Sequence, residues 1–128
     1  MSASTIIYGI LSSSAAVTGV VGTRIYPQQM PQTAQFPALT FTTISTVPNN
    51  SKSGVSTMDQ LRIQVTMLAN LQSTIDDLGS KVRTALDYYV SAPVQLISFQ
   101  SENDTFDEGS GQDGIFIKFQ DYFLTISK

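Results

Sequence analysis

The sequence contains no cysteine, no histidine and no tryptophan. Without cysteine the chain has no disulfides and no thiolate zinc sites, and without histidine it has no imidazole metal sites and no catalytic arrangement that needs a histidine base. The absence of cysteine also fits synthesis in a reducing cytosol. Most metal and covalent chemistries are thereby excluded, and we expect no cofactor.

Charge is also scarce, above all positive charge. Of 128 residues, seven are Lys or Arg and ten are Asp or Glu, which gives a net charge of −3. The seven cations are scattered, so no basic patch for gripping phosphates is apparent. No segment approaches the roughly 18 apolar residues of a membrane span, and the N-terminus lacks the positive region of a signal peptide. We expect no membrane contact and no direct readout of DNA.

What the sequence does contain is enough apolar residues for a folded core. Hydrophobic residues make up 41% of the chain. A chain of this length buries roughly 65–70% of its unfolded surface. Length and composition therefore predict a single domain over residues 1–128.

A first helix is predicted near the N-terminus. Ser4 is a suitable N-cap for a helix over about Thr5–Val17, with apolar residues at spacings of three and four. Gly19 and Gly22 can take positive φ, so we expect them to end this helix and turn the chain.

A second, longer helix is predicted in the middle of the chain, capped by Asn70 or Ser73 and continuing to about Tyr89. Its apolar stripe recurs every three or four residues and consists of Ile75, Leu78, Val82, Leu86 and Tyr89.

Four strands are predicted, at Phe36–Val47, Met58–Ala69, Val94–Glu102 and Gly114–Ser127. In the last one, the apolar set Ile115, Ile117 and Phe119 gives way to Tyr122, Leu124 and Ile126. This change of phase predicts a bulge near Gln120–Asp121 or a strand buried on both faces.

The predicted order is helix, strand, strand, helix, strand, strand. It indicates an α+β fold with a mainly antiparallel four-stranded sheet, an N-terminal helix and one longer central helix packed on one face.

The most distinctive stretch is the turn that follows the first helix. It reads Gly22-Thr23-Arg24-Ile25-Tyr26-Pro27, then a loop rich in proline and glutamine, then Phe36-Pro37-Ala38-Leu39-Thr40-Phe41. This pattern resembles the tail completion proteins of tailed phages, also called tail terminators or tail-to-head joining proteins. The order of elements over nearly the whole chain is similar to that family.

The resemblance implies a virion structural protein of the tail or neck, made in the host cytoplasm, and not an enzyme. It implies a homo-oligomeric ring, a hexamer, that caps the tail tube, stops its polymerisation and joins the tail to the head. The implied partners are the tail tube (major tail) protein and the head connector or adaptor protein, while DNA passes through the channel without specific binding.

Three other functions remain open on the residues alone. A head completion or connector-adaptor protein would act on the head side of the neck. A non-viral binding or adaptor domain would act as a monomer or dimer. The least favoured alternative is a hydrolase that uses the acidic residues near the C-terminus.

Two single residues are interface candidates. The guanidinium of Arg24 can lock its own turn through an intrachain contact or bind a neighbouring subunit. Tyr88 falls off the helix stripe, and an aromatic with a polar tip is favoured at interfaces, whereas Tyr89 is expected in the core.

The remaining candidates lie in three predicted loops. Two long polar loops, at Gln28–Gln35 and Asn49–Thr57, are long for a small domain and favour contact with partners. The third is an acidic loop over Asn103–Asp113, read as a solvated hairpin tip facing a partner, with a calcium loop as the less favoured alternative. The residues named are Gln28, Gln29, Met30, Gln32, Gln35, Asn49, Asn50, Lys52, Asp104, Asp107 and Glu108.

Overall fold

The computed structural model describes residues 3–27, 36–48, 58–90, 94–107 and 114–127. The predicted loops at Gln28–Gln35 and Asn49–Thr57 lie outside the described residues, as does the tip of the C-terminal hairpin.

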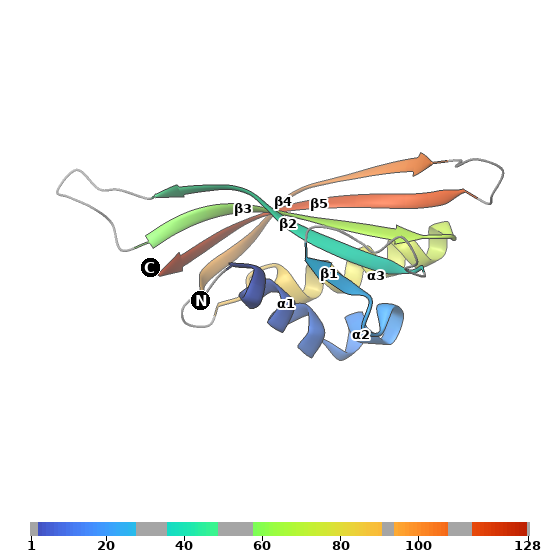
Figure 1. The fold of residues 1–128 in the computed structure, drawn as a ribbon, viewed down its shortest axis with the longest axis horizontal. Coiled ribbons are helices and arrows are strands. Elements are labelled where there is room, and N and C mark those ends of the chain that lie inside the picture. The colour runs from blue at the N-terminus through green and yellow to red at the C-terminus, as the bar shows by residue number, and fades with distance from the viewer. Residues whose placement is uncertain (1–2, 28–35, 49–57, 91–93, 108–113, 128) are drawn as a thin grey trace.

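The centre of the fold is a five-stranded sheet with the order β1-β2-β3-β5-β4 (Figure 1). The strands are β1 (Ile25–Pro27), β2 (Ala38–Pro48), β3 (Met58–Ala69), β4 (Val94–Asp107) and β5 (Ile115–Ser127). All neighbouring pairs are antiparallel except β1 and β2, which run parallel. The predicted α+β class and the mainly antiparallel pairing are confirmed, but the sheet has five strands and not the predicted four. Three residues are too few to show an alternating pattern, so β1 was read as part of a turn.

The N-terminal helix is two helices. They are α1 (Ala3–Ser13) and α2 (Ala15–Val21), with an angle of 87° between them. The break falls at Ser14, whose extended backbone and side-chain oxygen cap α2 by accepting from the N–H of Val17. A serine that bonds its own following turn competes with a continuous helix, which explains why the predicted single helix was wrong.

The central helix α3 spans Gln72–Leu86. Its N-cap is Leu71, which makes no side-chain cap, so neither predicted cap residue is used. It ends three residues before the predicted Tyr89, because Asp87 and Tyr88 leave the helical conformation.

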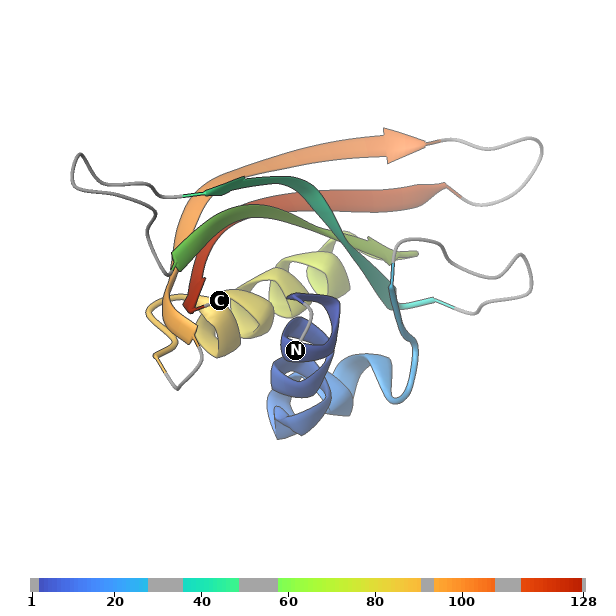
Figure 2. The same ribbon diagram turned by 60° about the vertical axis from the view of Figure 1, so that its left-hand side comes forward.

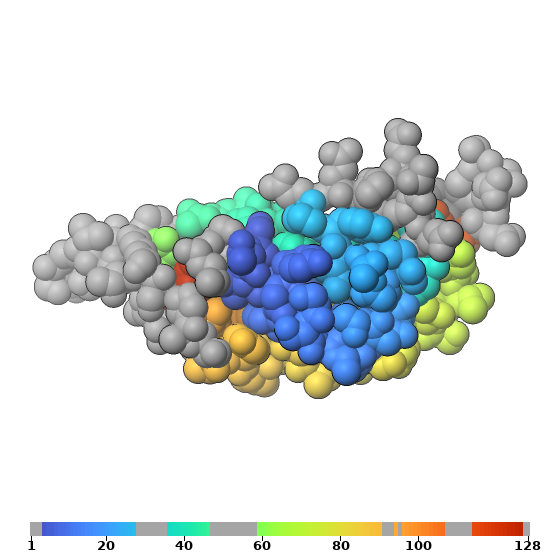
Figure 3. Space-filling model, turned by 60° about the horizontal axis from the view of Figure 1, so that its bottom comes forward, coloured from blue at the N-terminus to red at the C-terminus, as the bar shows by residue number. Residues whose placement is uncertain are grey.

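The three helices lie on one face of the sheet, which bends over them and leaves its other face uncovered (Figure 2). Seen from the helical side, α1 and α2 lie next to each other and α3 borders them (Figure 3). The apolar stripe of α3 and the helix-facing residues of β3 form the middle of the core. These buried side chains are Ile75, Leu78, Val82, Leu86, Leu61, Ile63, Val65 and Met67.

Strands β4 and β5 form a long hairpin whose pairing runs from Val94 and Ile126 to Asp107 and Ile115. The register shifts between Phe99 and Ser101, which leaves Gln100 as an extra residue in β4. The predicted bulge near Gln120–Asp121 is therefore wrong for β5, which keeps an unbroken register with β3, and the extra residue lies in the partner strand β4. The predicted acidic loop is also corrected, since Asn103–Asp107 continue β4.

Within the described residues, no single helix is long and apolar enough to cross a membrane; only the bent pair of α1 and α2 reaches that length and composition when counted together.

Candidate interaction surfaces

The turn that contains Arg24 joins the N-terminal helices to the sheet. Arg24 Nε donates to the carbonyl of Pro37 at 2.8 Å, and the carbonyl of Arg24 accepts from the N–H of Leu39 at 3.1 Å. Both bonds tie β1 to the start of β2. Ile25 is buried, whereas Tyr26 is only half-buried. The intrachain role considered for Arg24 is thus present in the structure.

Gly22 ends α2 with φ 61° and ψ −124°, a conformation that a residue with a Cβ adopts only under strain. Replacing Gly22 with Ala should lower the free energy of unfolding by about 1.5 kcal/mol. Chemical denaturation of the variant measures this loss.

The matched control is Gly19→Ala, because Gly19 lies inside α2 and an added Cβ meets nothing within 4 Å. This control should be neutral or more stable by up to about 1 kcal/mol. Equal losses in the two variants would contradict the strained turn.

Tyr88 lies where α3 meets β4, and its side chain is largely exposed, at 78%. It has φ 64°, the one positive φ of a residue other than glycine among the described residues. The N–H of Tyr88 donates to the carbonyl of Ile97 at 2.8 Å, and the N–H of Ile97 donates to the carbonyl of Tyr89 at 3.1 Å. These bonds hold the segment against the outer edge of β4. The structure therefore fixes Tyr88 in an uncommon conformation that points its ring away from the core.

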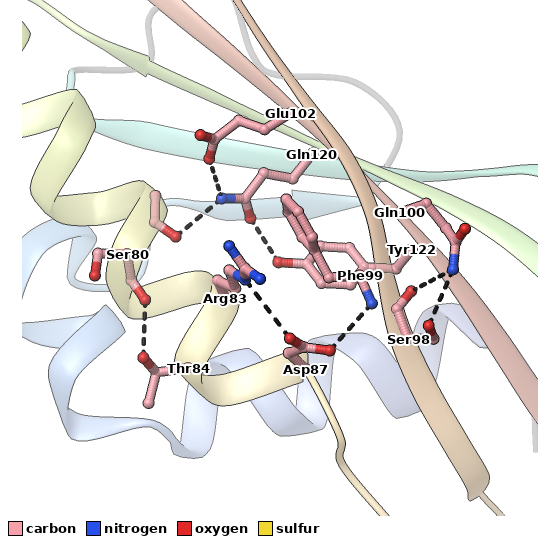
Figure 4. Close-up of polar contacts among 11 residues, drawn as sticks. Ser80, Arg83, Thr84, Asp87, Ser98, Phe99, Gln100, Glu102, Gln120 and Tyr122 are labelled. Carbon is pink, nitrogen blue, oxygen red and sulfur yellow. Dashed lines mark hydrogen bonds and ion pairs between the residues drawn. The ribbon is translucent and has the colours of Figure 1, made fainter.

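Asp87 and Arg83 reinforce the same junction (Figure 4). Asp87 Oδ1 accepts from the N–H of Phe99 at 3.1 Å, and Asp87 Oδ2 lies 3.5 Å from Arg83 Nε. The Arg83 guanidinium stacks over the Phe99 ring at 4.0 Å, a cation–π contact. The end of α3 is thus attached to β4 on both sides of the Tyr88 turn.

A buried lysine connects α3 with the distal half of the hairpin. The side chain of Lys118, 4% exposed, bonds the carboxylate of Asp104 at 2.8 Å and lies 3.6 Å from carboxylate oxygens of Glu102 and Asp76. Its methylenes lie so close to Gly79 that a Cβ there would come within 2.5 Å of Lys118 Cδ. Burial lowers the pKa of Lys118, but the bond to Asp104 and the three negative charges outweigh this and raise it above 10.5. This cation therefore stays charged at neutral pH.

Next to it, a chain of hydrogen bonds crosses the interior (Figure 4). The amide nitrogen of Gln120, fully buried, donates to the carbonyl of Gly79 at 2.9 Å and to the Glu102 carboxylate at 2.8 Å. The hydroxyl of Tyr122 donates to the amide oxygen of Gln120 at 2.6 Å. Burial raises the pKa of Tyr122 well above its usual 10.0, and the nearby Asp87 and Glu102 raise it further while Arg83 opposes them. The phenol is thus a neutral donor that fixes the orientation of the amide.

Asp104 is accordingly a structural partner of Lys118 with a half-exposed carboxylate, and Asp107 is the last residue of β4. Among the described residues, no group of three or more acidic side chains is placed to hold a metal ion. Lys118 and Gln120 were not singled out from the sequence, because a polar residue inside an alternating strand is normally read as solvent-facing. The other loop candidates lie outside the described residues: Gln28, Gln29, Met30, Gln32, Gln35, Asn49, Asn50, Lys52 and Glu108.

Comparison with protein families decides the kind of protein. The model of the family described as "Tail completion protein gp17" matches residues 5–120. The chain belongs to the tail completion protein gp17 family. As a tail completion protein it is a structural component of the phage tail, and its location is the virion tail or neck.

The fold is similar to one found in a phage-like particle. A chain from a structure titled "Virion of native gene transfer agent (GTA) particle" superposes with a TM-score of 0.70 at 14% sequence identity, covering 95% of this tail completion protein and 92% of that chain. At this identity the likeness concerns the fold alone. A search of curated proteins finds no significant match.

Proposed function

We propose that this tail completion protein assembles as a hexameric ring on the last ring of the tail tube. The ring stops further polymerisation of the tube and then presents the surface that joins the tail to the head. Its partners are further copies of itself, the tail tube protein and the head connector or adaptor protein. The proposed function consists of binding and assembly, and no residue is assigned a catalytic role.

The family match over residues 5–120 carries this proposal. The two edges of the sheet add a geometric argument. One edge is the 14-residue strand β4, and the other is the three-residue parallel strand β1. A cyclic head-to-tail ring needs two different surfaces on each subunit, because each copy meets its left neighbour with one and its right neighbour with the other. Because the β4 edge and the β1 edge differ from each other, the sheet suits this requirement.

The charges suit a ring through which DNA slides. Four of the described cations pair with carboxylates of their own chain: Arg62 with Asp121, Lys81 with Asp77, Arg83 with Asp87, and Lys118 with its three neighbours. Lysine and arginine side chains hold a phosphate backbone by displacing the small cations that are condensed on it. Cations already neutralised within the fold favour passage of DNA without specific binding.

The proposal is tested by deleting the gene and measuring tails by electron microscopy, together with native mass spectrometry of the purified protein. Loss of a terminator should give tails of uncontrolled length, and the purified protein should form closed rings, alone or on tail tubes. Tails of normal length that fail to join heads would instead favour an adaptor on the head side. A protein that stays monomeric both in solution and on tubes would contradict ring assembly.

A further inference from the structure

The two opposite edges of the sheet carry a projection and a hollow. The projection is the Tyr88 ring, which is 78% exposed and is accompanied by Val90 and Leu96, 64% and 40% exposed. Large apolar side chains gathered this way on a surface mark contact sites. The segment lies against β4, the last strand on one side of the sheet.

The projection is held in a fixed direction. A left-handed backbone costs a residue such as tyrosine about 1–2 kcal/mol, so the surrounding structure must impose it. Here the backbone bonds to Ile97 on β4 and the attachment of Asp87 to Phe99 impose it from both sides. Residues held in an uncommon backbone conformation cluster at functional sites, and this one also exposes an aromatic ring.

The hollow lies at the other edge. It has a volume of about 260 Å³ and is lined by Ser4, Thr5 and Tyr8 from α1, Pro27 from β1 and Phe41 from β2. Figure 3 shows this part of the surface, where α1 in dark blue borders β2 in teal. The hollow is smaller than the roughly 300–1,000 Å³ of sites for drug-sized ligands, so it suits a single side chain. The rings of Tyr8, Pro27 and Phe41 favour an aromatic occupant, and the hydroxyl of Ser4 can meet its polar tip.

The projection and the hollow of one chain cannot meet, because β2, β3 and β5 separate the two edges. They can meet between neighbouring copies in a ring where each subunit shows one edge to the left and the other to the right. We propose that Tyr88 of one copy inserts into the hollow formed by α1, β1 and β2 of the next copy, and is the anchor of the subunit interface. This inference rests on the proposed ring and names the residues that close it.

The first test compares Tyr88→Ala and Tyr88→Gly with the wild-type protein. Both should weaken association at each interface by at least about 30-fold, as loss of a central aromatic anchor does. At a concentration where both proteins are monomeric, Tyr88→Gly should keep a melting temperature at least equal to wild type, because glycine adopts positive φ without strain and the lost ring is exposed. Loss of rings in this variant therefore reports on assembly and not on folding. Leu71→Ala, which removes another exposed apolar side chain, at 62%, is the matched control and should leave assembly unchanged.

The second test uses the natural absence of cysteine. Tyr88→Cys and Ser4→Cys proteins, mixed and treated with a short bismaleimide, should give cross-linked dimers of one variant with the other. Neither variant alone should cross-link, whereas the double variant should give a ladder up to the closed ring. If wild-type rings form but persist without Tyr88, or if Tyr88→Cys cross-links to itself, this inference is wrong and the proposed ring stands. If wild-type protein forms no ring in solution or on tubes, the proposed function itself fails.

Discussion

Replacing Gln120 with leucine should lower the free energy of unfolding by about 3 kcal/mol, one of the two largest effects we expect. Leucine keeps most of the volume but leaves the buried hydroxyl of Tyr122 without its acceptor and the carbonyl of Gly79 without one of its donors. Each buried polar group that loses its partner costs about 1–3 kcal/mol. Denaturation by urea at a concentration where the protein is monomeric measures the loss.

A double-mutant cycle shows whether the loss comes from the broken bond. Tyr122→Phe alone removes the donor and leaves the amide oxygen of Gln120 without this hydrogen bond, so it should lower the free energy of unfolding by about 1–2 kcal/mol. The double variant Gln120→Leu, Tyr122→Phe removes both the donor and the acceptor of that bond, so neither is left without a partner. It should therefore be more stable than the sum of the single losses predicts, by at least about 1 kcal/mol. Strict additivity would mean that the 2.6 Å bond between Tyr122 and Gln120 contributes nothing.

Replacing Lys118 with methionine should cost about 2 kcal/mol. The variant leaves Asp76, Glu102 and Asp104 close together without their shared cation. Removing one partner of a fully buried ion pair costs about 3–5 kcal/mol. We expect less here, because water reaches the three carboxylates, whose side chains are 57%, 39% and 54% exposed.

The control for the Lys118→Met substitution is Lys81→Met. Lys81 pairs with Asp77 at 2.8 Å on the surface of α3, where such a pair contributes no more than about 0.5 kcal/mol. The two substitutions remove the same charge, so the difference between them isolates burial. A loss of the same size in both would contradict the role of Lys118 as the link between α3 and the hairpin.

The dependence of stability on pH gives a second measurement on Lys118→Met. The pKa of Lys118 is raised above 10.5 in the folded protein, so its contribution is fully present below pH 10.5 and is lost as the pH rises through the folded value. Tyr122 acts in the same direction, since its pKa is raised above 10.0 and the unfolded chain loses that proton first. Wild-type stability should therefore fall above about pH 10. The stability of the Lys118→Met variant should fall less steeply over the same pH range.

The sequence predicted those parts of the fold that depend on local periodicity. The stripe of α3 and the alternation of β3 place Ile75, Leu78, Ile63 and Val65 in the core, where the structure has them. A helix of four turns or a strand of twelve residues repeats its pattern often enough to be recognised. The three residues of β1 repeat nothing, and their pairing with β2 depends on contacts distant in sequence.

The polar interior was missed for a different reason. Lys118 and Gln120 lie on the helix-facing side of β5, together with Tyr122. Their partners come from α3 and β4, so nothing near them in the sequence marks them as buried. The acidic residues of β4 were likewise read as a loop, because their pairing with β5 across the hairpin is visible only in the fold. Tyr88 is a contrasting case: its ring is exposed, but α3 ends before it and its backbone is left-handed, so its place off the helix stripe is not the reason.

The extra residue in β4 decides which side of the hairpin carries its charges. Before Gln100, Ile97 and Phe99 share a face with the helix-facing residues Leu124 and Tyr122; after it, Glu102 and Asp104 do so with Gln120 and Lys118. A regular ladder that included Gln100 would instead turn every later side chain of the strand to the opposite face. Glu102 and Asp104 would then leave Lys118 although neither had been changed. The bulge at Gln100 therefore sets the face that the charges of this strand occupy, and deleting Gln100 would keep Ser101 opposite Asp121 and Glu102 opposite Gln120.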